Sequence, residues 1–242
     1  MKKFEFTGEI KKSFGIELKR IRALVEINFE GAIVKPGDLG GWLEKESNLS
    51  HDGNAWVGDN ARVCGNAWVC GNAWVGDNAE VYDNAEVCGK AMVYGNAMVY
   101  GNARVCGNAR VCGNAEVYGN AWVYGNAWVY DNAEVCGNAE VYGNAEVYGN
   151  AFLFKAEHVL TIGAIGSRRS FTTFFRNKKG EIQVRCGCFF DTIDEFLAKV
   201  QQTHEDNKHA IVYRAAVNVA LAQIDTTPYV DNDNEESGHA PN

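Results

Sequence analysis

Residues 113–130 read Gly-Asn-Ala-Glu-Val-Tyr-Gly-Asn-Ala-Trp-Val-Tyr-Gly-Asn-Ala-Trp-Val-Tyr, a six-residue unit that occurs three times in succession. The unit continues without insertion from Asn54 to Ala151. Ala recurs at every sixth residue from 55 to 151, and Val recurs at every sixth residue from 57 to 147, after which Leu153 takes its place. A short, fixed period of this kind indicates a solenoid, in which each unit packs only on its neighbours.

Each unit contains a short strand and a corner. Ala and the Val two residues later point to the same side of an extended segment, and the variable residue between them points to the other side. The preceding Gly-Asn or Asp-Asn pair predicts a corner, because Gly and Asn tolerate the left-handed backbone conformation. Asn precedes Ala at 16 of 17 positions, so we expect amide ladders between corners. Lys90 is the exception and predicts a strained corner.

The segment Val-Tyr-Gly-Asn-Ala-Trp-Val (residues 123–129) resembles the hexapeptide repeat of left-handed parallel β-helix proteins. In that family three hexads form one triangular coil of 18 residues. The resemblance implies a mainly β fold, with five to six coils stacked about 4.8 Å apart. It also implies a homo-oligomer, with a trimer favoured, because proteins of this family are commonly trimers.

An 18-residue coil sorts the outward residues onto three faces. Face one carries Trp56, Trp74, Met92, Arg110, Trp128 and Glu146, with Tyr94, Tyr130 and Tyr148 beside them; face two carries Arg62, Glu80, Met98, Glu116, Glu134 and Phe152; face three carries Trp68, Glu86, Arg104, Trp122 and Glu140, beside a column of Cys70, Cys88 and Cys106. Exposed aromatic patches mark contact surfaces. We therefore expect an interface made by Trp56, Trp74, Met92, Trp128, Tyr94 and Tyr130. The alternative is that aromatic residues simply suit a flat strand surface.

The limits of the repeat pattern divide the chain into four predicted regions. They are an N-terminal β cap (1–50), the β-helix (51–163), a C-terminal α+β module (164–225) and a disordered acidic tail (226–242). At the first boundary the pattern places Leu49 in the Ala position and His51 in the inward Val position. The cap should close the open end of the solenoid.

The C-terminal module is predicted to contain two strands and two helices, a ββαα order. Strands at 170–176 and 181–190 flank a turn at 177–180. A capping box at Thr192–Glu195 starts the first helix, and the second runs from about 208 to 224. The predicted buried stripe of the second helix is Ile211, Ala215, Val219 and Ala222.

Composition and charge exclude several classes of protein. The net charge of −8 and pI near 5.2 argue against direct binding of nucleic acid. The sequence shows no signal peptide and no apolar run of membrane-spanning length, and six of its eight Cys share a repeat position with Tyr. We therefore expect free thiols, a cytoplasmic location and no membrane partner.

Two further segments resemble bacteriophage and prophage proteins. Ile165-Gly166-Ser167-Arg168, Arg185-Cys186-Gly187-Cys188-Phe189, Asp194-Glu195-Phe196 and His204 resemble a module that often follows hexapeptide repeats in those proteins, and Gly37 to Trp42 with Asn48-Leu49-Ser50 resembles their lead-in. The resemblance implies a phage context, and a location in the host cytoplasm.

The sequence contains few candidates for catalytic, metal-binding or anion-binding residues. Many hexapeptide proteins are acyltransferases that use a catalytic His and acetyl-CoA, but no His lies between Asp52 and Glu157, which leaves His51 and His158 as the candidates. Cys186 and Cys188 have a spacing that is weak for zinc, so no metal and no cofactor is predicted. Ser167, Arg168, Arg169 and Arg185 could bind an anion such as phosphate, and the alternative for them is a solvated turn with salt bridges.

The predicted function is that of a non-catalytic, phage-type binding protein. It would sequester or block a host defence protein or a nucleotide-like signal. The first alternative is an acyltransferase of the hexapeptide family that uses acetyl-CoA. The second alternative is a structural spacer.

Overall fold

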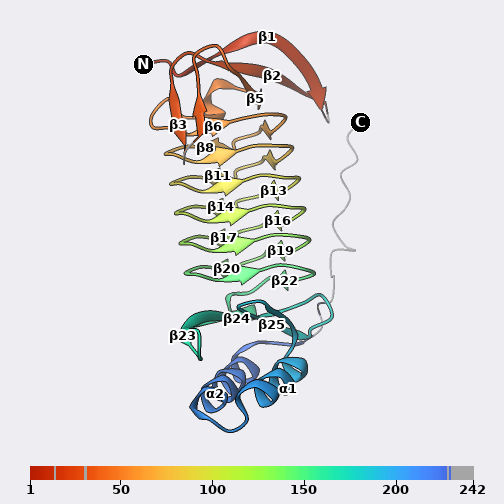
Figure 1. Ribbon diagram of the computed structural model, residues 1–242. Coiled ribbons are helices and arrows are strands. Elements are labelled where there is room, and N and C mark those ends of the chain that lie inside the picture. The colour runs from red at the N-terminus through yellow and green to blue at the C-terminus, as the bar shows by residue number, and fades with distance from the viewer. Residues whose placement is uncertain (14, 30–31, 228, 230–242) are drawn as a thin grey trace.

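The computed structural model describes residues 1–13, 15–29, 32–227 and 229, and it shows a β-helix closed by a different structure at each end (Figure 1). An antiparallel hairpin covers the N-terminal end, and a small sheet with two helices covers the C-terminal end. Nearly all of the predicted acidic tail, 226–242, lies outside the described residues.

The β-helix consists of two-residue strands in parallel register. They are β6 (Trp56–Val57), β7 (Arg62–Val63), β8 (Trp68–Val69), β9 (Trp74–Val75), β10 (Glu80–Val81), β11 (Glu86–Val87), β12 (Met92–Val93), β13 (Met98–Val99), β14 (Arg104–Val105), β15 (Arg110–Val111), β16 (Glu116–Val117), β17 (Trp122–Val123), β18 (Trp128–Val129), β19 (Glu134–Val135), β20 (Glu140–Val141), β21 (Glu146–Val147) and β22 (Phe152–Leu153). Each strand pairs with the one 18 residues away, for example Glu86 with Arg104. The predicted 18-residue coil is therefore confirmed, and so are the three faces, since each forms its own sheet.

The interior of the β-helix is built from the Ala and Val of each hexad. Every one of these side chains is almost completely buried, and together they form one continuous apolar cluster with both caps. Backbone bonds join the coils, as where the N–H of Arg104 donates to the carbonyl of Ala121 at 2.9 Å and the N–H of Cys106 donates to that of Val123 at 2.9 Å. A thin core is sufficient because each coil adds a complete set of such bonds.

The corners turn at the residue before Asn. This residue, Gly or Asp, has a positive φ at every sixth position from Gly53 to Gly149, and no Asn among the described residues does. The Asn is therefore not the left-handed residue. The predicted strain at Lys90 is also wrong, because the left-handed residue there is Gly89, and the N–H of Lys90 donates to the carbonyl of Gly107 like that of any corner Asn.

The corner Asn side chains form the predicted amide ladders. Nδ2 of each Asn donates to Oδ1 of the Asn 18 residues later, at 3.0–3.5 Å, along Asn60–Asn132, Asn66–Asn138 and Asn108–Asn144. Lys90 occupies the third column, between Asn72 and Asn108, and interrupts it.

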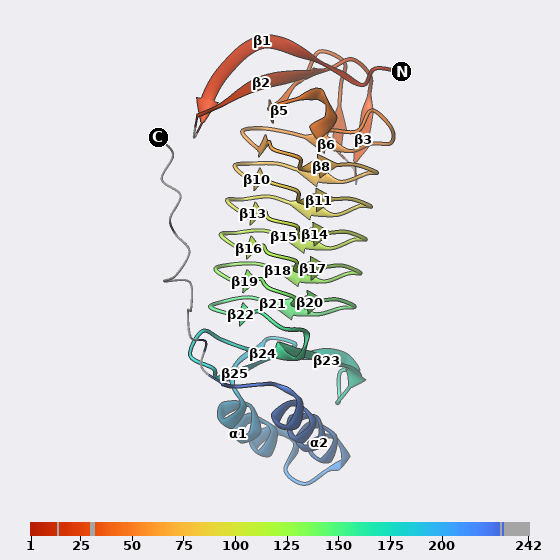
Figure 2. The ribbon, with the colours of Figure 1, turned by 180° about the vertical axis from the view of Figure 1, so that it is seen from behind.

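The N-terminal cap continues the sheet of face two. Its elements are β1 (Phe4–Ser13), β2 (Ile16–Ala23), β3 (Ile27–Phe29), β4 (Ala32–Val34), β5 (Leu39–Leu43) and the 3₁₀ turn η1 (Glu46–Asn48). β1, β2 and β5 pair antiparallel, and β5 then pairs parallel with β7, so the hairpin leans over the first coil (Figure 2).

The repeat register changes by two residues at this end. Leu43 pairs with Val63 and Leu49 with Val69, a separation of 20 residues rather than 18. Leu49 therefore occupies the Val position and not the Ala position, and the expectation that His51 points into the core in that position is wrong. The extra residues lie between Leu49 and Trp56.

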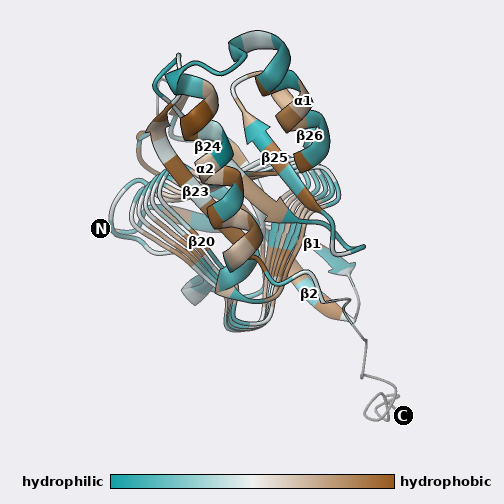
Figure 3. Cartoon of the chain, turned by 90° about the horizontal axis from the view of Figure 1, so that it is seen from below, coloured by the Kyte–Doolittle hydropathy of each residue, from teal (hydrophilic) through white to brown (hydrophobic). Residues whose placement is uncertain are grey.

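The C-terminal module contains four strands, not two. They are β23 (Val159–Ile165), β24 (Ser170–Arg176), β25 (Ile182–Cys186) and β26 (Phe189–Thr192), preceded by the turn η2 (Ala156–His158) and followed by α1 (Ile193–His204) and α2 (Lys208–Gln223). The predicted strand at 181–190 is a tight hairpin that turns at Gly187 and Cys188. Viewed from this end, the helices lie across the sheet (Figure 3).

The buried side of α2 differs from the prediction. Its buried residues are Ala210, Tyr213, Ala216, Val217 and Ala220, which pack with Phe174 and Phe196 in a second apolar cluster. The residues predicted to be buried face the solvent instead, with Ile211 61% and Val219 49% exposed. The Thr192 cap is confirmed, because its side chain accepts the N–H of Glu195.

The interrupted ladder predicts a stabilising substitution. Lys90→Asn should join Asn72 to Asn108 through new amide hydrogen bonds, each of which contributes about 1 kcal/mol. We expect the variant to unfold at a higher urea concentration than the wild type, measured by circular dichroism. Lys90→Ala is the matched control, because it removes the lysine without adding an amide. Equal midpoints for the two variants would contradict the ladder's contribution.

A candidate ligand site in the C-terminal module

A cavity of about 370 Å³ opens between the sheet and helices of the module. Its walls are Ser167, Arg168 and Ser170 from the β23–β24 connection, Cys186, Gly187, Cys188 and Phe189 from the β25–β26 turn, and Phe196, Lys199, Val200, Thr203, His204 and Tyr213 from the helices. A volume of this size lies in the range of small-molecule sites.

Two turns with left-handed residues shape the mouth of the cavity. Gly166 has a φ of +71° and lies so close to the Tyr213 hydroxyl that any Cβ there would collide with it. Arg169 also has a positive φ, of +48°, which ends the turn and starts β24. On the opposite side Gly187, at +62°, allows the β25–β26 hairpin to turn sharply beside Arg168.

The charge around the cavity is positive. Arg168 and Lys199 line it, and no Asp or Glu is among the described residues that do. Nη1 of Arg168 lies 3.8 Å from Sγ of Cys188, and Lys199 is held by Gln202 at 2.9 Å. Since a guanidinium offers a planar set of donors to phosphate or carboxylate, the geometry favours an anionic ligand.

The floor of the cavity is aromatic. The ring centroids of Phe189 and Phe196 are 5.3 Å apart, and those of Phe196 and Tyr213 are 5.5 Å apart at nearly right angles. The Cys186 thiol lies 3.8 Å from the Tyr213 hydroxyl and 3.3 Å from that of Thr172. Burial raises the pKa of Tyr213 to about 12, so its hydroxyl stays protonated at neutral pH. Phe196 and Tyr213 are buried and Phe189 is half-buried, so Phe189 is the ring whose surface can receive a planar apolar group.

The four residues predicted to bind an anion do not form one cluster. Ser167 and Arg168 line the cavity, whereas Arg169 is exposed outside it. Arg185 faces the β-helix, where its Nε donates to Oε2 of Glu146 at 2.8 Å. Successive strand residues point to opposite faces, so Cys186 reaches the cavity and Arg185 cannot.

Sequence reasoning missed the contribution of the helices. Lys199, Thr203 and Phe196 share the cavity-facing side of α1, and the spacing of 196, 199, 200 and 203 is helical. That signal was present, but it does not show which side of α1 faces a cavity rather than the sheet.

His51 has a structural role at the N-terminal cap. Its Nδ1 accepts the backbone N–H of Lys3 at 3.1 Å, its Nε2 lies 2.8 Å from Oε1 of Glu46, and its ring stacks on Phe4 at 4.6 Å. Both ring nitrogens are thus engaged within the cap, so His51 is not placed as a general base.

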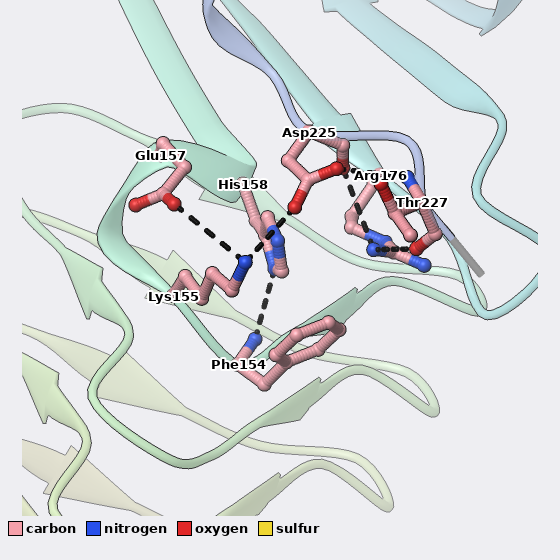
Figure 4. Close-up of polar contacts among 7 residues, drawn as sticks. All are labelled: Phe154, Lys155, Glu157, His158, Arg176, Asp225 and Thr227. Atoms are coloured by element: carbon pink, nitrogen blue, oxygen red, sulfur yellow. Dashed lines mark hydrogen bonds and ion pairs between the residues drawn. The ribbon is translucent and has the colours of Figure 1, made fainter. Parts of the chain in front are cut away.

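His158 lies completely buried in η2, where the β-helix meets the module (Figure 4). Its Nδ1 accepts the N–H of Phe154 at 3.1 Å, and its Nε2 has no partner in the described structure. Burial, together with the nearby Arg176 guanidinium, lowers the pKa of His158 to about 4. It therefore stays neutral at pH 7, and it has no exposed surface through which to contact a substrate.

Charged groups around His158 join η2 to the end of α2. Lys155 donates to Asp225 at 2.9 Å, and the buried Arg176 donates to the carbonyls of Asp225 and Thr227 at 3.4 and 2.9 Å (Figure 4). Hydrogen bonds from Thr227 and Lys155 hold the pKa of Asp225 well below its usual range. These bonds fix the chain after α2 against the last coil.

The predicted interface on face one is partly covered by the chain itself. Trp56 is only 1% exposed, because Gly40 of the cap packs on it, so its predicted place in an exposed interface is wrong. The Trp74 ring lies 5.2 Å from Phe29 of the cap. Met92, Tyr94 and Tyr130 are half-buried, and Trp128 is exposed near the module. The oligomeric state remains a prediction.

Two thiols in the column on face three are held in the protonated form. Burial raises the pKa of Cys88 to about 12 and also raises that of Cys70. Among the described residues, no group of three His, Cys, Asp or Glu side chains is arranged to hold a metal ion. Neither helix in the described ranges is long and apolar enough to cross a membrane.

Comparison with known proteins identifies the repeat alone. A family model described as the YdcK β-solenoid repeat matches residues 61–77, 91–107, 103–117, 109–125 and 115–131, all within the β-helix. No curated protein matches the chain. Together with the observed coils, the match defines a repeat β-solenoid protein, and it includes no residue of the cavity.

The buried His158 predicts a pH dependence of stability. Its folded pKa of about 4 lies below the usual value of 6.5, so the unfolded chain takes up a proton that the folded protein does not. The free energy of unfolding should therefore fall as the pH drops from 7 to 4, by on the order of 2 kcal/mol from this group. Urea unfolding at pH 7, 5.5 and 4.5 measures this loss.

The control variant for this test is His158→Asn, whose side chain offers the same acceptor to Phe154 and does not titrate. It should lose less stability than the wild type over the same pH interval. An identical pH dependence in the two proteins would show that His158 is not the group responsible.

Proposed function

We propose that this chain is a non-catalytic binding protein that sequesters a nucleotide-like anion in the cavity of its C-terminal module. The observation that carries the proposal is the combination of Arg168 and Lys199 with an aromatic floor, and no carboxylate among the described lining residues. A nucleotide needs both parts, because its phosphate requires charged donors and its base requires a flat apolar surface.

The β-helix supports this function as a rigid base. The module docks on the last coil through Arg185–Glu146 at 2.8 Å and Lys178–Glu134 at 2.6 Å, and through the N–H of Glu146, which donates to Thr173 at 3.2 Å. A preorganised site loses less entropy when it binds a ligand. The phage resemblance favours a signal of the infected host as the ligand, since a binding protein lowers the free concentration of what it holds.

The alternatives have less support from the geometry. The acyltransferase alternative depends on His51 or His158, and both side chains are held in structural contacts. The spacer alternative accounts for the β-helix but gives no role to the cavity. If the chain instead sequesters a host protein, the exposed part of face one would be the binding surface.

The test of the proposal is a binding measurement with Arg168→Gln. Isothermal titration calorimetry with AMP should show binding to the wild type and a loss of about ten- to hundred-fold in the variant, the range for hydrogen bonds to a charged group. Acetyl-CoA serves as the comparison ligand for the acyltransferase alternative.

Arg169→Gln is the matched control, since Arg169 is the next residue of the same turn and is exposed outside the cavity. It should bind AMP like the wild type. No binding of AMP by the wild type, or equal losses in the two variants, would contradict the proposed site.

A further inference from the structure

A second cavity, of about 400 Å³, lies where the module meets face one of the β-helix. Its β-helix side is formed by Trp128, Glu146 and the corner residues Asn126 and Asn144, and its module side by Ser170, Phe171, Thr173, Arg185 and Gly187. It is thus built from two parts of the chain that are separate in sequence.

The two cavities adjoin. Ser170 and Gly187 line both of them, so these two residues form the wall that the cavities share. Arg168 lies at this wall, because a Cβ added to Gly187 would be only 3.1 Å from its Nη1. A side chain at this position would therefore press against the guanidinium, which is exposed.

The second cavity has its own aromatic surface. Trp128 and Phe171 are 36% and 42% exposed and line the same cavity, and the Trp128 ring also lies beside Tyr130 and Arg110. The amides of Asn126 and Asn144 are joined at 3.1 Å. Glu146 also lines this cavity and pairs with Arg185 at 2.8 Å, so the two charges offset each other and the cavity offers no free positive charge of its own. Its chemistry suits a planar ring with polar edges rather than a second phosphate.

From this arrangement we propose that the two cavities form one site for a dinucleotide. One base lies on Phe189, the linking phosphate lies at Arg168, and the second base lies against Trp128 and Phe171. The inference rests on the proposed function and specifies its ligand class. A mononucleotide fills only the first cavity and leaves the exposed rings of the second in water.

The experiment compares four ligands by isothermal titration calorimetry on the full chain: adenosine, AMP, the dinucleotide adenylyl-3′,5′-adenosine and a ten-nucleotide oligoadenylate. The dinucleotide should bind about ten-fold or more tightly than AMP, in line with the free energy of stacking one more base on an aromatic side chain. Adenosine, without phosphate, should bind more weakly than AMP. The oligoadenylate should gain nothing over the dinucleotide.

Trp128→Ala should reduce dinucleotide affinity to that of AMP and leave AMP affinity unchanged. Trp122→Ala is the matched control, because Trp122 has a similar exposure of 39% but lies on face three, outside both cavities. Circular dichroism confirms that each variant is folded.

The outcomes separate the inference from the proposed function. If AMP binds but the dinucleotide binds no more tightly, or if Trp122→Ala has the same effect as Trp128→Ala, the two-cavity site is overturned and the AMP site stands. If the oligoadenylate binds more tightly than the dinucleotide, the ligand class is wrong. If no nucleotide binds, both proposals fall.

Discussion

The fold depends on a close contact between corner backbones of successive coils. A Cβ added to Gly107 would lie 3.0 Å from the backbone nitrogen of Gly125, one coil away, and Gly107 also has a φ of +72°. The corner therefore excludes most side chains for two reasons, conformation and space. Where Asp replaces Gly, its carboxylate provides a bond in return, as where Asp77 accepts the N–H of Gly95 at 2.9 Å. This requirement at every sixth residue fixes the period.

The two ends of the β-helix are closed by related turns. In η1 the side chain of Asn48 accepts the N–H of Lys45 at 2.9 Å, and in η2 that of His158 accepts the N–H of Phe154 at 3.1 Å. Asn48 also donates to the carbonyls of Gly65 and Ala67 in the next coil. His158 has no further coil to bond with, so its Nε2 is left unpaired in the described structure. Its burial follows from closing a solenoid, which explains why a candidate catalytic residue has a structural role.

The repeat made most of the β-helix predictable, because the six-residue period fixes which residues point inward, and the resemblance to left-handed β-helix proteins implied three hexads per coil and so the sorting into faces. The ends were less predictable for physical reasons. The register change at Leu49 depends on which strand it pairs with, and pairing is not visible in one sequence. Burial of Trp56 depends on the cap folding back over it. In α2, apolar residues occupy both sides, so helical spacing permits two buried stripes, and only the position of the sheet selects Tyr213 over Ile211.

The candidate site was predictable only in part, because its cavity is assembled from separate segments of the module. Arg168 could be chosen from its turn, but the cavity also needs α1 and the Gly187 hairpin. Its neighbour needs Trp128, which belongs to the repeat. The outward position of each hexad is free to vary, since it does not affect the core. At Glu146, one coil after Trp128, that freedom provides the carboxylate that binds Arg185 and docks the module. The variable residue of the repeat therefore makes the contacts that position the site, while Ala, Val and Gly maintain the β-helix.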